Sequence, residues 1–226
     1  QFHAAGSLAF RDLLFHTKDL PEKIAIAQAQ LNFNPANVKL SDLSMKLGNS
    51  DLQANGTLDN LLAYLMKDQT LKGSLSLQSR FFDLDPWMAG ESSGFSAVAL
   101  PDKIEFNLNS AFQEVKYSGL RLHNVRGAML LKDRTLHLRD VSMNMLNGAM
   151  VMNGRYSTPT DKPVNLFFDL KVNALSIGQT FQNFVTVQKF APIAQSMQGS
   201  FSSRFQIATD VDSSLMPIFD SLNSQG

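Results

Sequence analysis

Apolar and polar residues alternate along much of the chain, which is the pattern of half-buried β-strands. One clear example places Ile104, Phe106 and Leu108 on the same side of a strand, and another runs through residues 164–172 with Phe168 on its apolar side. Roughly a dozen such segments follow one another, separated by turn residues. This pattern predicts a mainly β (α+β) fold, a long twisted antiparallel sheet.

Asparagine–glycine pairs are the strongest turn signals in the sequence. Asn55-Gly56, Asn147-Gly148 and Asn153-Gly154 stand between apolar pairs, as does Lys132-Asp133-Arg134. Because such pairs suit the tight turns that connect twisted antiparallel strands, we expect hairpins at all four places.

Helical periodicity interrupts the strands. A short helix is predicted to begin at Asp59 or Asn60, and a longer one covers approximately residues 178–197, with Pro192 expected to kink or restart it. We expect the longer helix to pack near the end of the sheet or on its apolar face. A third short helix is expected over residues 214–222.

The chain contains an internal repeat. The shift that brings Asp42-Leu43-Ser44-Met45 onto Asp140-Val141-Ser142-Met143 also brings Asn55-Gly56 onto Asn153-Gly154. Turn residues recur in any β protein, but the matched spacing favours duplication. We therefore expect one domain over residues 1–226, built from two related meanders.

The repeat units extend approximately over residues 24–88 and 122–177. We also expect the chain to be a piece of a longer protein, because it begins with Gln1.

Composition removes several function classes. The chain has 226 residues, of which 44% are hydrophobic and 18% charged, with a formal net charge of +0. That balance gives no electrostatic basis for nucleic-acid binding. Since there are no cysteines, disulfides, thiolate nucleophiles and zinc fingers are excluded.

The sequence offers no catalytic arrangement. Its four histidines lie in separate segments without metal-ligand spacing. Asp83 and Asp85, near Trp87, form a close carboxylate pair that could in principle bind calcium or act in acid–base chemistry, but Asp85 before Pro86 is more typical of a turn. We predict no enzyme activity, no metal site and no cofactor.

Two surface features suggest binding instead. The chain has ten methionines and seventeen phenylalanines, and four of the methionines fall in one predicted hairpin. Methionine lines adaptable apolar surfaces, although an ordinary core also needs such residues. The candidate residues for a lipid-binding groove are Phe106, Met143, Met145 and Phe168.

Basic residues also gather in one predicted meander. They could form a positive stripe towards phosphate headgroups or an acidic partner, or simply a solvated strand face. These residues are Arg121, Arg126, Lys132, Arg134 and Arg139.

Several motifs together give a family resemblance. They are Gly6-Ser7-Leu8-Ala9-Phe10-Arg11-Asp12, Asn32-Phe33-Asn34-Pro35, Asn55-Gly56-Thr57-Leu58-Asp59-Asn60-Leu61, Phe82-Asp83-Leu84-Asp85-Pro86-Trp87-Met88 and the late stretch from Phe190 to Phe201. With these motifs, most of the chain resembles the AsmA-like proteins. The motifs are loose glycine, asparagine and aliphatic spacings, so the resemblance assigns no catalytic residue.

The resemblance implies a bacterial envelope protein with its bulk in the periplasm. The longer protein of which this chain would be a piece would be anchored in the inner membrane by an N-terminal helix, which this chain lacks. AsmA-like proteins are associated with outer-membrane biogenesis and lipid movement, and they look like repeating β-groove bridges. We therefore expect a module that shields the acyl chains of a phospholipid or another envelope lipid. The alternative is a structural or assembly module that contacts outer-membrane proteins or partner strands.

Overall fold

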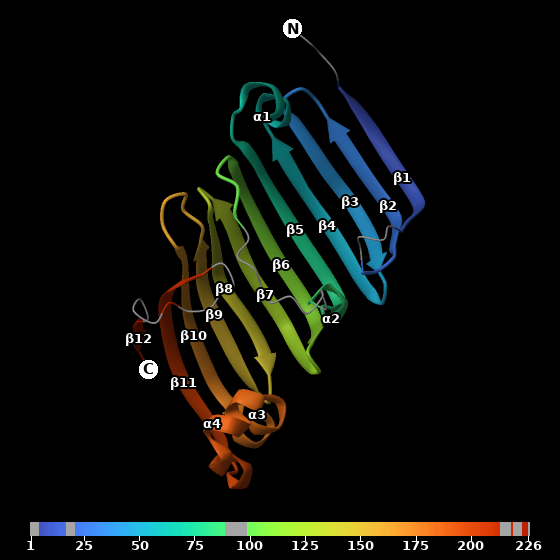
Figure 1. Cartoon of the computed structure of the whole chain (residues 1–226). Helices are drawn as coiled ribbons and strands as arrows, with labels where there is room; N and C mark the ends of the chain where they lie inside the picture. Colours follow the sequence, from blue (N-terminus) through green and yellow to red (C-terminus); the bar gives the residue numbers. More distant parts are fainter. Residues whose placement is uncertain (1–4, 17–20, 89–98, 213–217, 219–222, 226) are drawn as a thin grey trace.

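A computed structural model describes residues 5–16, 21–88, 99–212, 218 and 223–225. The chain is mainly β and forms one long, open, twisted sheet in which each strand lies beside the next in sequence (Figure 1). The strands are β1 (Gly6–Phe15), β2 (Ile24–Phe33), β3 (Asn37–Leu47), β4 (Ser50–Asp59), β5 (Leu71–Asp83), β6 (Ile104–Tyr117), β7 (Leu120–Lys132), β8 (Thr135–Met145), β9 (Gly148–Ser157), β10 (Val164–Ser176), β11 (Ser200–Val211) and the short β12 (Asn223–Gln225).

One pair of neighbouring strands is parallel. β5 and β6 run in the same direction, with Leu71 opposite Ile104 and Asp83 opposite Lys116, whereas the other neighbouring strands are antiparallel. The expectation of a wholly antiparallel sheet is therefore wrong at this pair, and the sheet is mixed. Because β6 begins beside the start of β5, a tight hairpin cannot connect these two strands.

Aspartates with positive φ adjust the alternation within strands. Asp42 in β3 has φ 54° and Asp140 in β8 has φ 48°. At Asp42 the pairing with β4 shifts register between Leu40 and Leu43, and β8 shifts in the same way against β9. Because aspartate tolerates the left-handed region, each strand can insert one extra residue at this point. Leu40 and Leu43 in β3 consequently lie on the same side of the sheet, as do Leu138 and Val141 in β8.

The turns differ in part from the prediction. Asn55-Gly56 lies inside β4 and Asn153-Gly154 inside β9, so neither pair forms a turn. The expected turn at Asp133-Arg134 is confirmed, with φ 48° and 56°. The turn between β8 and β9 has Leu146-Asn147 at its centre, with φ 48° and 61°, one position earlier than the asparagine–glycine pair suggests.

The helices lie at the ends of strands (Figure 1). The first predicted helix is confirmed as α1, and its N-cap is Asn60, without a side-chain cap. The predicted long helix is instead broken at Phe184 and Ala191, where the backbone leaves the helical region. The helical elements are α1 (Leu61–Lys67), α2 (Asp85–Met88), α3 (Ile177–Asn183), α4 (Val185–Phe190) and the 3-10 helix η1 (Pro192–Ser196).

Pro192 opens η1 rather than kinking a continuous helix, since its ring prevents α4 from running on. The third helix, expected over residues 214–222, falls outside the described residues apart from Ile218.

Within the described residues, the sheet is not packed against a second layer (Figure 1). The accessible surface is 14802 Å², whereas a compact monomer of this mass exposes about 10,200 Å². The buried core of the described residues includes a cluster near the ends of β8 and β10, formed by Met143, Met145, Val172 and Leu175. Much of the sheet is therefore stabilised by strand pairing and by contacts within one layer of side chains.

Candidate functional site

One side of the sheet carries continuous rows of apolar residues. Strand pairing aligns a first row of Leu8, Leu31, Leu40, Gly56, Leu75, Leu108, Met129, Leu138, Gly154, Phe168 and Ile207, from β1 to β11. A second row consists of Phe33, Val38, Leu58, Gly73, Phe106, Leu131, Leu136, Tyr156 and Leu166. We call the side of the sheet that bears these two rows the apolar face.

The apolar face is shielded unevenly along the sheet. Most side chains of its rows are half-buried by their neighbours on adjacent strands. At the ends of the first row they are exposed, with Leu8 in β1 at 51% and Ile207 in β11, beside the short strand β12, at 43%. Neither row contains a charged residue, so the first row is an uninterrupted apolar line from β1 to β11 and the second from β2 to β10.

Phenylalanine rings on this face lie over glycines of the neighbouring strand. A Cβ atom added to Gly73 would come 2.7 Å from the Phe106 ring, and one added to Gly154 would come 3.0 Å from the Phe168 ring. The two rings therefore occupy the space that a side chain on the next strand would fill. This arrangement is a known way of packing glycine in sheets, and it keeps the aromatic rings close to the backbone.

The four candidate groove residues separate into two pairs. Phe106 and Phe168 are half-buried in the open part of the apolar face. Met143 and Met145 are 8% and 6% exposed and belong to the packed cluster, against which Phe184 also packs. All four are on the same side of the sheet, but only the phenylalanines lie where a ligand could reach them without displacing the core.

Sequence reasoning missed the contribution of β1 to the apolar face. Its apolar side chains Leu8, Phe10, Leu13 and Phe15 are 51%, 36%, 42% and 51% exposed. The sequence signal that could have revealed it is the alternation of apolar and polar residues in β1, which shifts by one position at Asp12, where φ is 52°.

The opposite side of the sheet is polar, and several of its basic residues are paired. Lys132 contacts Glu105 at 3.4 Å, and Arg134 contacts Asp102 at 3.7 Å. Arg121 pairs with Glu114. These ion pairs favour a solvated strand face over a positive stripe for phosphate headgroups.

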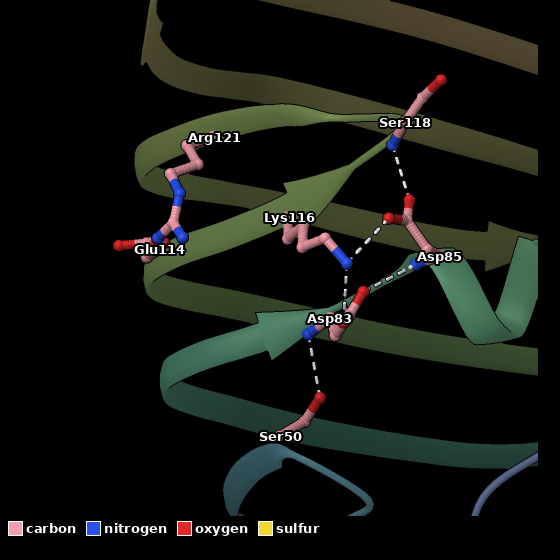
Figure 2. A network of polar contacts seen from close by, with 7 residues as sticks. All are labelled: Ser50, Asp83, Asp85, Glu114, Lys116, Ser118 and Arg121. Atoms are coloured by element: carbon pink, nitrogen blue, oxygen red, sulfur yellow. Dashed lines mark hydrogen bonds and ion pairs between the residues drawn. The ribbon is translucent and has the colours of Figure 1, made fainter.

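An ion-pair network joins the two meanders at the parallel strands (Figure 2). Lys116 on β6 lies 3.1 Å from Asp83 and 3.2 Å from Asp85. The backbone N–H of Asp83 donates to the Ser50 hydroxyl at 2.8 Å, and the N–H of Ser118 donates to Asp85. The two carboxylates thus join β5 and α2 to β6, and the backbone of Asp83 joins β5 to β4, which argues for a structural role over calcium binding or acid–base chemistry.

Charge interactions shift the pKa values of this network. The Ser118 N–H, followed by Lys116, lowers the pKa of Asp85, and Asp83 and Asp85 raise the pKa of Lys116. Elsewhere, Arg204 lowers the pKa of Asp169. An aspartate whose pKa is lowered in the folded state stabilises the fold at pH values above its unfolded-state pKa, and this stabilisation is lost in acid. A lysine whose pKa is raised in the folded state stabilises the fold at pH values below its unfolded-state pKa, and this stabilisation is lost in alkali.

The pH dependence of stability follows from these directions. We expect a constant thermal midpoint around neutral pH, a fall below about pH 4 and a further fall above about pH 10.5. The Lys116→Gln variant should have a lower plateau and a shallower acid fall, because Asp85 then loses its cation. Thermal unfolding followed by circular dichroism across pH tests this expectation. If the Lys116→Gln variant had the same dependence of thermal midpoint on pH as the native chain, the network would not contribute to the stability of the fold.

The described residues contain no group of three or more His, Cys, Asp or Glu placed to hold a metal ion. Within the same residues, no helix is long and apolar enough to cross a membrane.

Comparison with known proteins gave no match among family models, curated proteins or solved structures.

Proposed function

We propose that this chain is a non-enzymatic module of the bacterial cell envelope that holds lipid acyl chains on its apolar face. The observation that carries the proposal is the apolar face itself, which crosses eleven strands and which no second layer formed by the described residues covers. Exposed apolar patches of this extent mark binding surfaces. The resemblance to AsmA-like proteins supplies the compartment, the periplasm, with a parent protein anchored in the inner membrane.

The geometry of the rows suits acyl chains. The rows run across the strands and therefore along the length of the sheet, so an extended chain can lie over many strands at once. Each buried methylene contributes about 0.8 kcal/mol. Because neither row has a charged or hydrogen-bonding anchor at its centre, the lipid is held by area rather than by a fixed headgroup site. Such a surface supports movement of lipid towards the outer membrane.

A structural or assembly module is the second candidate function. It is favoured by one observation: among the described residues β1 pairs with β2 only, so its other edge could receive a strand from an envelope protein. The two functions differ in their ligand, so lipid analysis separates them.

Native mass spectrometry of chain purified without detergent is the direct test. We expect a phospholipid bound in defined stoichiometry, identified after extraction. Protein that stays empty after incubation with vesicles of phosphatidylethanolamine and phosphatidylglycerol would contradict the lipid proposal and favour the assembly module.

Two adjacent phenylalanines provide a matched pair of variants. Phe168 lies on the apolar face, whereas Phe167 lies on the polar side, where the Arg155 guanidinium is 6.0 Å from its ring. We expect Phe168→Gln to weaken lipid capture about tenfold, equivalent to roughly 1.4 kcal/mol, and Phe167→Gln to leave it unchanged. Lipid retention is compared by native mass spectrometry at equal folded fraction. Equal loss in both variants would exclude specific binding to the apolar face.

A further inference from the structure

Uncharged hydrogen-bonding side chains cover the interior strands β2 to β6 on the side of the sheet opposite the apolar face. We call these side chains the polar array. Its members are Gln28, Gln30 and Asn32 in β2, Ser41 and Ser44 in β3, Gln53, Asn55 and Thr57 in β4, Ser74, Ser76 and Gln78 in β5, and Asn107 and Asn109 in β6. Lys39 and Ala111 complete the rows, and Asp42 lies in the bulge of β3 beside them.

Strand pairing arranges the polar array in rows that run across the strands. In one row Gln28 lies opposite Ser44, Ser44 opposite Gln53, and Gln53 opposite Gln78. Neighbouring strands are about 4.8 Å apart, so a ligand that crosses the sheet meets a further hydrogen-bonding side chain at nearly every strand. The adjacent rows contain Gln30, Ser41, Asn55, Ser76 and Asn109, and Asn32, Lys39, Thr57, Ser74 and Asn107.

The hydrogen-bonding groups of the polar array are largely free of protein partners. Among the described residues, Thr57 and Ser74 are the only members with a side-chain hydrogen bond, which joins their hydroxyl groups at 3.2 Å. All members are exposed or half-buried. Amide side chains both donate and accept hydrogen bonds, and so do hydroxyl groups. The array therefore offers donors and acceptors together to a ligand.

Two hollows on this side of the sheet share residues of the polar array. Their volumes are about 300 Å³ and 310 Å³, and Gln53 and Gln78 line both. Gln28, Ser44 and Asn55 line the second hollow as well. The surface is thus recessed at neighbouring places along the direction of the rows.

We propose that the polar array binds an extended polysaccharide that lies across β2 to β6. Sugar hydroxyl groups donate and accept hydrogen bonds, as the amide and hydroxyl side chains of the array do. A nucleic acid would require cations, of which the rows contain one, Lys39. A protein partner would use aromatic or apolar anchors, which the array lacks. The strand spacing is also close to the length of one pyranose residue in an extended β-linked chain, so successive sugars meet successive strands.

The affinity of such a surface depends on the length of the ligand. Each neutral hydrogen bond replaces one with water and contributes little by itself, so binding requires several sugars in contact at once. The inference does not rest on the proposed lipid function, because the array and the apolar face lie on opposite sides of the sheet. Loss of one binding activity should leave the other intact.

Isothermal titration calorimetry with cellohexaose and chitohexaose tests the proposal on the native chain. We expect at least one hexasaccharide to bind about tenfold more tightly than the disaccharide of the same sugar. A double variant, Gln53→Ala with Gln78→Ala, should bind it about tenfold more weakly, because it removes two facing amides that line both hollows. The control Asn144→Ala removes an exposed amide of β8 outside the array and should bind like the native chain.

Three results would overturn the proposal. The first is the absence of binding of either hexasaccharide at millimolar concentration. The second is equal affinity for disaccharide and hexasaccharide, which would exclude a ligand extended over several strands. The third is equal affinity of the double variant and the native chain, with folding of both checked by circular dichroism, since the ligand would then bind elsewhere. Lipid retention measured by native mass spectrometry should be the same in the double variant and the native chain.

Discussion

Replacement of Met143 by aspartate is expected to lower the free energy of unfolding by roughly 3–5 kcal/mol. Met143 is 8% exposed and packs with Met145, Val172 and Leu175. Partly buried apolar side chains, Leu122, Val125 and Phe184 among them, pack against this cluster. An ionised aspartate there would be desolvated without compensation, and a protonated one would still leave polar atoms unsatisfied.

The neighbouring position supplies the control. Asn144→Asp adds the same charge one residue later in β8, where the side chain is exposed on the opposite side of the strand. We expect that variant to remain within about 0.5 kcal/mol of the native chain. Urea denaturation followed by circular dichroism measures both. Equal midpoints for Met143→Asp and the native chain would show that the methionine cluster is not a packed core in solution.

This expectation affects how lipid binding should be tested. Met143→Asp would lose bound lipid by unfolding the end of the sheet, whether or not the methionine ever touches lipid. A variant in the open part of the apolar face, such as Phe168→Gln, separates the two effects. For candidate residues chosen from composition alone, the burial of each side chain must therefore be known before the residue is assigned to lipid binding or to folding.

Alternation along the sequence predicted the strands well because it reports directly which side chains share a face. It also placed Phe106 and Phe168 on one apolar side. The packing of Met143 and Met145 could not be predicted in this way, since it depends on side chains from other elements, such as Leu122 in β7 and Phe184 after α3. Periodicity shows the face of a residue but not what covers it.

Strand direction and turns were harder to predict for a related reason. A strand has the same alternation in either direction, so nothing in residues 71–83 or 104–117 announces that β5 and β6 are parallel. Asn55-Gly56 has the composition of a hairpin turn, but the local preference is overridden by pairing on both sides of β4. The glycine is needed there for space rather than for turning.

The space at Gly56 leads to a second large expected effect. A Cβ atom at this position would lie 2.2 Å from the backbone oxygen of Ser74 and 3.1 Å from the Cα atom of Leu75. Both atoms belong to the backbone of β5, so no side-chain rotation can relieve the clash. We therefore expect Gly56→Ala to destabilise the chain by about 3 kcal/mol, the upper part of the range for overpacking.

Gly178→Ala is the matched control for the Gly56 prediction. Gly178 lies in α3 with no atom within 4 Å of an added Cβ, so alanine there should be neutral or stabilise the helix by up to about 1 kcal/mol. Urea denaturation of the two variants isolates contact with β5 from the general effect of replacing glycine. If Gly56→Ala matched Gly178→Ala in stability, β4 and β5 could separate at this point without cost. The first apolar row would then not depend on their close approach. A large difference would show that the row is continuous because glycine lets Leu75 pack directly against β4.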